Sequence, residues 1–111
     1  MNYQNVTPVQ LGLAAITGTV ATLYTVPLLT KTYLKDINIC NTTASSITVN
    51  VYLVPSGGTA GTSNALLYGF SVAANSIYHW SGVQVLNTGQ SLQVSASTTG
   101  TTIIASGGEA V

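Results

Sequence analysis

The chain is 111 residues long, and its composition combines 46% hydrophobic residues with only 4% charged residues and a formal net charge of zero. Soluble domains ordinarily have about a quarter of their residues charged. Two basic residues are too few for the phosphate contacts of nucleic acid binding or for attraction to an anionic membrane surface. Because charge keeps a free-standing monomer soluble and separate from its copies, this composition indicates a protein whose surface is largely covered by other protein.

The length suits one domain that forms a core without help from disulfides or metals. No run of about 18 consecutive apolar residues predicts a membrane span, since polar residues and a proline interrupt the most apolar segment, 20–29. The first residues lack the basic start and the unbroken apolar stretch of a secretory signal. The single cysteine, Cys40, is predicted to be a small buried hydrophobe in a protein made in the cytoplasm.

Residues 1–18 are predicted to form an extended N-terminal arm, and residues 19–111 are predicted to form the folded domain. The apolar residues of the arm are Val6, Pro8, Val9, Leu11 and Leu13. They show no long regular period, and glycines interrupt them. Alternation of apolar and polar residues then predicts strands at 19–26, 32–41 and 46–54. The last two are joined by a short polar segment, which predicts a hairpin.

The second half of the chain begins with a glycine-rich loop at 55–64 and then alternates in the same way. The alternation predicts strands at 65–72, 76–81, 91–97 and 101–106. The abundance of Thr, Val, Ile and Gly disfavours helices. The sequence therefore predicts an all-β fold, a single β-sandwich or jelly-roll domain of seven or eight short antiparallel strands with an extended N-terminal arm.

Few residues are available for chemistry, because the chain has one histidine, two carboxylates and one cysteine. His79 and Asp36 could be combined with any of many serines, so such a triad is uninformative, and no nucleophile-elbow motif is present. A metal site is not predicted, since there is no second histidine and the other candidate ligands lack the usual spacing. Lys31 and Lys35 are predicted to form a local ion pair with Asp36. We therefore expect no enzymatic activity, no metal and no cofactor.

Aromatic residues cluster at 77–80, with the sequence IYHW. Packing at the core or its rim is the plainer interpretation of Tyr78 and Trp80, because a buried tryptophan is common in sandwiches. The functional interpretation is a contact between subunits, since Trp and Tyr dominate interface energetics. A third possibility is carbohydrate binding by exposed aromatics, with Tyr52 and Tyr68 as further candidates.

Four stretches of the chain resemble a known group of proteins. These are residues 21–27 (ATLYTVP), 37–43 (INICNTT), 51–61 (VYLVPSGGTAG) and 86–97 (LNTGQSLQVSAS). They resemble small virion proteins of tailed bacteriophages, a loose group of head-decoration, head-fibre and tail-associated β-sandwich modules. The resemblance covers about residues 19–105 and is a pattern of strands and turns. It implies a structural protein, often trimeric, and assigns no functional site residues.

The resemblance and the composition together predict a non-enzymatic virion protein, made in the host cytoplasm. The leading hypothesis is a capsid decoration protein that binds the outside of a phage head as a homo-oligomer, with a trimer favoured, and stabilises the shell. Its partners would be the major capsid protein or other virion proteins, with no nucleic acid and no membrane. The apolar residues of the arm are the candidate anchors, and Tyr78 and Trp80 are weaker candidates for subunit contacts.

One alternative is a tail- or fibre-associated module that binds host carbohydrate or another virion protein. A main building block of a shell is a third hypothesis, disfavoured by the short chain.

Overall fold

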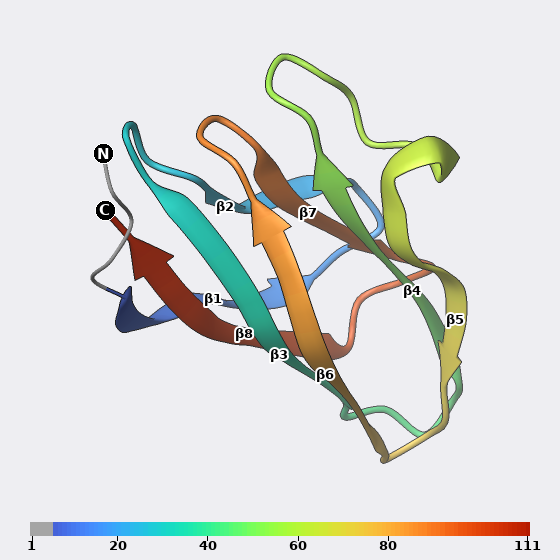
Figure 1. Ribbon diagram of the computed structural model, residues 1–111. Helices are drawn as coiled ribbons and strands as arrows, with labels where there is room; N and C mark the ends of the chain where they lie inside the picture. Colours follow the sequence, from blue (N-terminus) through green and yellow to red (C-terminus); the bar gives the residue numbers. More distant parts are fainter. Residues whose placement is uncertain (1–5) are drawn as a thin grey trace.

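The computed structural model describes residues 6–111, which form two stacked antiparallel sheets of four strands each (Figure 1). Sheet A has the order β1-β8-β3-β6, with β1 Val6–Ile16, β8 Thr101–Ala110, β3 Lys31–Asn41 and β6 Ile77–Leu86. Sheet B has the order β2-β7-β4-β5, with β2 Ala21–Thr25, β7 Ser91–Ala96, β4 Ile47–Val54 and β5 Ala65–Val72. One short 3-10 helix, η1 Thr62–Asn64, precedes β5. The predicted all-β sandwich is confirmed.

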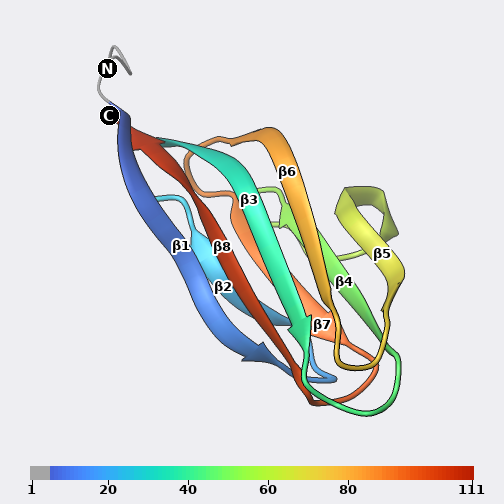
Figure 2. The same ribbon diagram turned by 90° about the horizontal axis from the view of Figure 1, so that it is seen from below.

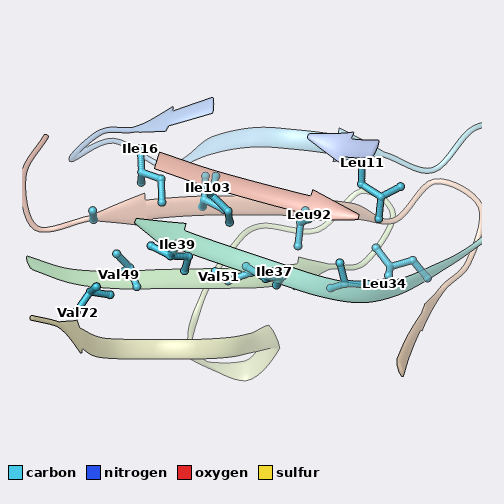
Figure 3. Close-up of a cluster of buried hydrophobic side chains, with 14 of the residues drawn as sticks. Leu11, Ile16, Leu34, Ile37, Ile39, Val49, Val51, Val72, Leu92 and Ile103 are labelled. Carbon is cyan, nitrogen blue, oxygen red and sulfur yellow. The ribbon is translucent and has the colours of Figure 1, made fainter. Parts of the chain in front are cut away.

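The core lies between the two sheets and is built from the apolar positions of the alternating strands. Ile37 and Ile39 of β3 belong to the same fully buried cluster as Val49 and Val51 of β4. Figure 3 shows this cluster, with labelled side chains contributed by strands of both sheets. Burying each such side chain contributes about 1.5–3 kcal/mol before the cost of ordering the chain is subtracted. The alternation of apolar and polar residues in these strands therefore correctly predicts which side chains face the core.

The chain crosses from one sheet to the other at nearly every connection, and among consecutive strands only β4 and β5 pair with each other. The predicted hairpin between 32–41 and 46–54 is wrong, because β3 belongs to sheet A and β4 to sheet B. Alternation shows which residues of a strand are buried, but it does not show which sheet the strand joins. A short polar loop can connect strands of two different sheets as readily as it connects the two strands of a hairpin.

The predicted arm differs most from the structure. Residues 6–16 form the edge strand β1, which pairs with β8 along its whole length and is part of the sandwich. Two of its side chains, Leu11 and Ile16, are buried in the core. A register shift between Gln10 and Gly12 lets Leu11 turn inward, and this β-bulge breaks the alternation that would reveal a strand. Residues 1–5 of the predicted arm lie outside the described residues.

Two other strands are longer than predicted. β6 continues past 81 to Leu86, and β8 continues past 106 to Ala110 through a pair of glycines. A side chain at Gly107 would overlap the carbonyl oxygen of Tyr33 on β3. The glycine therefore permits a close approach of two backbones and does not end the strand. Residues 6–111 include no helix of the length and apolarity needed to cross a membrane.

Candidate interaction surface

The outer face of sheet A, turned away from the core, is the most apolar exposed part of the molecule. Strand register places Leu13, Ile104, Asn38 and His79 in one row across all four strands. The exposed apolar residues of this face, which we call the apolar face, come mainly from the two edge strands and β8: Val6, Pro8, Leu13, Ile77, Val83, Val85 and Ile104. Figure 2 shows β1 and β6 at opposite edges of this sheet, with β8 and β3 between them.

The five candidate anchors of the predicted arm are divided between the two sides of β1. Val6, Pro8 and Leu13 are exposed and lie on the apolar face. Leu11 is buried, and Val9 is partly buried and packs against the core. The anchors therefore do not act as one group: three of them are accessible to a neighbouring chain, and two hold β1 to its own sandwich.

The two aromatic candidates of β6 lie on its inner side. Tyr78 and Trp80 are partly buried against the core, and the Tyr78 ring lies 4.2 Å from the ring of Phe70 on β5. Their strand is at the edge of sheet A, so these rings close one side of the sandwich. The carbohydrate hypothesis needs a shared exposed aromatic surface, but Tyr52 is buried and Tyr68 is exposed on a strand of the other sheet.

A histidine–carboxylate contact lies in the middle of the apolar face. The His79 imidazole Nε2 bonds to the Asp36 carboxylate Oδ2 at 2.6 Å, between the neighbouring strands β6 and β3. Sequence proximity pointed to Lys31 and Lys35 as partners of Asp36, whereas the structure supplies His79 from 43 residues away. Cys40, predicted to be a small buried hydrophobe, is partly exposed on this face beside Ile77. The bulge in β6 opposite Lys35 separates these residues from the apolar pair Val83 and Val85.

The outer face of sheet B is polar and bonded to itself. The Asn50 amide donates to the Ser95 hydroxyl at 3.1 Å, and its Oδ1 accepts from the Gly69 backbone at 2.7 Å. The Gln93 amide donates to the Ser91 hydroxyl at 2.9 Å. These uncharged groups satisfy one another across β4, β7 and β5.

A polar link joins the two sheets at one end of the sandwich. The Tyr24 hydroxyl of β2 donates to the Glu109 carboxylate of β8 and lies 2.7 Å from the Thr32 hydroxyl of β3. Burial, reinforced by the hydrogen bond to Glu109, raises the pKa of Tyr24 to about 12. Sequence analysis missed this link, because its three residues are up to 85 positions apart and nothing local connects them.

The β2–β3 loop presents two leucines that the sequence analysis also missed. Leu28 is 84% exposed and Leu29 is 63% exposed. Leu29 has a φ of 56°, a left-handed conformation that is uncommon for a leucine. The Thr88 hydroxyl donates to the Thr30 carbonyl at 2.7 Å and so holds this loop against the β6–β7 loop. Residues 6–111 contain no pocket and no group of three potential metal ligands.

No protein-family model matches this chain, and no curated protein matches it. Solved structures do. A chain in the structure of the Gx strain of infectious bursal disease virus aligns with 96% of this chain at 13% identity and a TM-score of 0.57. A chain of the T13 particle of the same virus aligns with 96% at 14% identity and a TM-score of 0.54. A chain of the VP2 subviral particle of infectious bursal disease virus aligns with 96% of this chain at 14% identity and a TM-score of 0.51.

These similarities show a shared fold. This chain spans about a third of each matched chain, with coverages of 32%, 30% and 32%. The matched structures come from infectious bursal disease virus, so the resemblance to tailed-phage proteins stays a prediction.

Proposed function

We propose that this chain is a non-enzymatic structural protein of a virion, which packs against other virion proteins through the apolar face. One observation carries the proposal: a sheet face that exposes at least six aliphatic side chains and carries one internally paired carboxylate. Monomeric soluble proteins rarely expose large contiguous apolar patches, and such patches mark sites of protein contact. In a chain with 4% charged residues, nothing else opposes association.

The strand order supports this assignment. The orders β1-β8-β3-β6 and β2-β7-β4-β5 correspond to a jelly roll, an eight-stranded double-sheet architecture that is common in viral capsid domains. The matched chains come from structures of viral particles. Because one fold serves many functions, this similarity raises the prior for a virion protein, and the apolar face supplies the physical argument.

The dimensions of the apolar face fit a stable contact. Four strands of about ten residues each cover roughly 19 Å by 33 Å, or about 600 Å². A standard interface buries about 800 Å² on each partner. The flat face thus supplies most of one standard contact, and adjacent loops such as Leu28–Leu29 would complete it. Repetition by symmetry over a shell would then add many such contacts.

Two roles in the particle fit this contact. We favour decoration, in which oligomers of the chain attach to the outside of a phage head assembled from a different capsid protein. The second role is a shell-building domain, favoured by the alignment of 96% of this chain with chains from viral particles.

Light scattering and co-sedimentation test the proposal. The purified chain is first measured alone over a range of concentrations and then mixed with capsids that lack it. Decoration predicts stoichiometric co-sedimentation that saturates, with no closed particles formed by the chain alone. A shell-building role predicts closed particles from the chain alone. A freely soluble monomer at high concentration, with no affinity for any shell, would refute both.

A further inference from the structure

The four edge strands of the sandwich differ in how well they resist pairing with another chain. Exposed edges carry unpaired N–H and C=O groups, and proteins usually protect them with prolines, charges, bulges or short length. β1 has Pro8 and a register shift, β2 has five residues and a register shift, and β5 has two register shifts against β4. Three of the four edges are therefore poor templates.

The fourth edge strand, β6, lacks most of these protections. Its ten residues include no proline and no Lys, Arg, Asp or Glu. Its register against β3 shifts once, near Gly82 and Val83, and is regular over Ile77–Ser81. Outward residues on this strand are well exposed, with Ile77 at 63%. An uncharged, regular and exposed edge is the form of strand that accepts a further strand.

We propose that β6 pairs antiparallel with β6 of a second copy, about a two-fold axis at His79, and so joins two A sheets into one. This inference rests on the proposed function, and it names a second copy of the chain as the first protein that the chain binds. In this register Tyr78 lies opposite Trp80 of the other copy, and Trp80 lies opposite its Tyr78. Cross-strand aromatic pairs stabilise an antiparallel ladder. Ile77 lies opposite Ser81, and His79 lies opposite its own copy, with each imidazole bonded to Asp36 of its own chain.

The second copy is favoured over a different protein by this self-complementarity. In a two-fold antiparallel pair, the same segment of the two copies runs in opposite directions, so its residues must suit one another in that arrangement. The segment Ile77–Ser81 does so, because each aromatic residue then lies opposite an aromatic residue of the other copy. The partly buried positions of Tyr78 and Trp80 at the open side of the sandwich leave part of each ring accessible to a neighbour. Because the regular segment is only about 17 Å long, the contact is smaller than a standard interface. We therefore expect a dimer of about micromolar affinity, which assembly would strengthen through multiple contacts.

Disulfide trapping tests the register. In a Cys40→Ser background, the His79→Cys variant places two thiols directly opposite each other, within the reach of a disulfide. The matched control is Ser81→Cys, on the same strand and the same face. In the proposed register its thiol lies about 13 Å from its counterpart, which no disulfide spans without backbone movement. We expect a covalent dimer from mild oxidation of His79→Cys only. Equal trapping of both variants, or of neither, would overturn the register.

Sedimentation tests the edge itself in the full-length chain. We expect a concentration-dependent dimer for the unmodified protein and a monomer for Ile77→Lys, because a lysine on an edge strand opposes pairing. The control is Leu13→Lys, at the opposite edge of the same sheet, which should still dimerise. A trimer, or equal loss of dimer in both variants, would overturn the proposal. Attachment to capsids is measured separately, so a capsid-binding monomer would refute the pairing and leave the proposed function standing.

Discussion

The outer faces of the two sheets follow the same alternation but carry different chemistry. On sheet A, outward positions hold aliphatic residues such as Leu13, Ile77 and Ile104. On sheet B, they hold amides and hydroxyls that bond to one another, as Asn50 does with Ser95. The face of sheet A also carries Lys35 and the bonded pair Asp36–His79, but its aliphatic residues gain free energy from losing water and the polar groups of sheet B do not.

This difference assigns the faces different roles. On the apolar face the Asp36 carboxylate already bonds to His79, so the exposed Lys35 is the main charged group there whose hydration a neighbouring chain must leave in place or replace. Removing water from the face of sheet B would strip hydration from groups whose internal bonds use only part of their capacity. We infer that the apolar face is turned towards neighbouring protein and the face of sheet B towards solvent.

The largest expected effect comes from disrupting sheet A itself. In Gly107→Ala, the new methyl group would overlap the Tyr33 carbonyl oxygen on β3 and press on Leu11. Neither the backbone nor the packed leucine yields easily, so we expect a loss of more than about 3 kcal/mol in the free energy of unfolding. Urea denaturation measures this loss.

Gly61→Ala is the matched control for that substitution. No atom lies within 4 Å of the position of its added methyl group, and its backbone is extended with a φ of −171°. We expect a change within about 0.5 kcal/mol. If both variants unfold at the same urea concentration, β8 does not approach β3 as closely as described.

The next effect compares the two faces directly. Leu13→Lys places a charge on the apolar face, and Thr48→Lys places one at an exposed position of β4 in sheet B. Loss of one buried aliphatic contact costs about 1.5–3 kcal/mol. We therefore expect Leu13→Lys to weaken capsid binding by about 10- to 100-fold, and Thr48→Lys to leave it nearly unchanged. Co-sedimentation over a range of concentrations measures both.

The opposite ranking of these two variants would reverse the assignment of the faces. Equal weakening by both would mean that neither sheet face dominates, and the loop with Leu28 and Leu29 would become the leading candidate. Thermal melting of each variant shows that the fold is intact. Both positions are exposed, so we expect the melting temperatures to stay close to that of the unmodified chain.

The sequence predicted the sandwich and most of its strands, because burial of alternate residues leaves a visible pattern. The prediction was wrong where a single residue interrupted the alternation: the bulge at Leu11 breaks the pattern of β1, so this strand was not predicted. If residues 1–18 formed a separate arm, deleting them would leave a folded sandwich. Since Leu11 and Ile16 are core residues, we now expect this deletion to destabilise the whole fold.

The candidate surface was only partly predictable. Low charge indicated that a covered surface exists, but its position depends on which strands are neighbours. The row of Leu13, Ile104, Asn38 and His79 joins four segments, and its first and last residues along the chain are 91 positions apart. No short-range pattern connects such residues, and the same holds for the link from Tyr24 to Glu109.

A smaller effect tests the link that ties sheet B to sheet A. The pKa of Tyr24 rises from its ordinary value of 10.0 to about 12, chiefly by burial. The folded state therefore favours the neutral phenol, and this contribution is present below pH 10 and is lost as the pH rises towards about 12. Tyr24→Phe should be less stable at neutral pH, but its stability should fall less between these two pH values. Urea midpoints at three pH values measure this. Equal slopes for both proteins would show that Tyr24 does not contribute.

The smallest expected effect is that of salt on association. Interactions between exposed charges weaken as the Debye length shortens from about 10 Å at 0.1 M to about 3 Å at 1 M. The charged groups of the apolar face are the exposed Lys35 and the Asp36 carboxylate, which bonds to His79 of the same chain, and its aliphatic residues outnumber them, so we expect contacts through this face to depend little on charge. We expect the association constant measured by light scattering to change by less than about threefold over this range, or to rise slightly as salt strengthens burial of apolar surface. A steep fall with ionic strength would show that charged groups hold the chains together, and the role given to the apolar face would then be wrong.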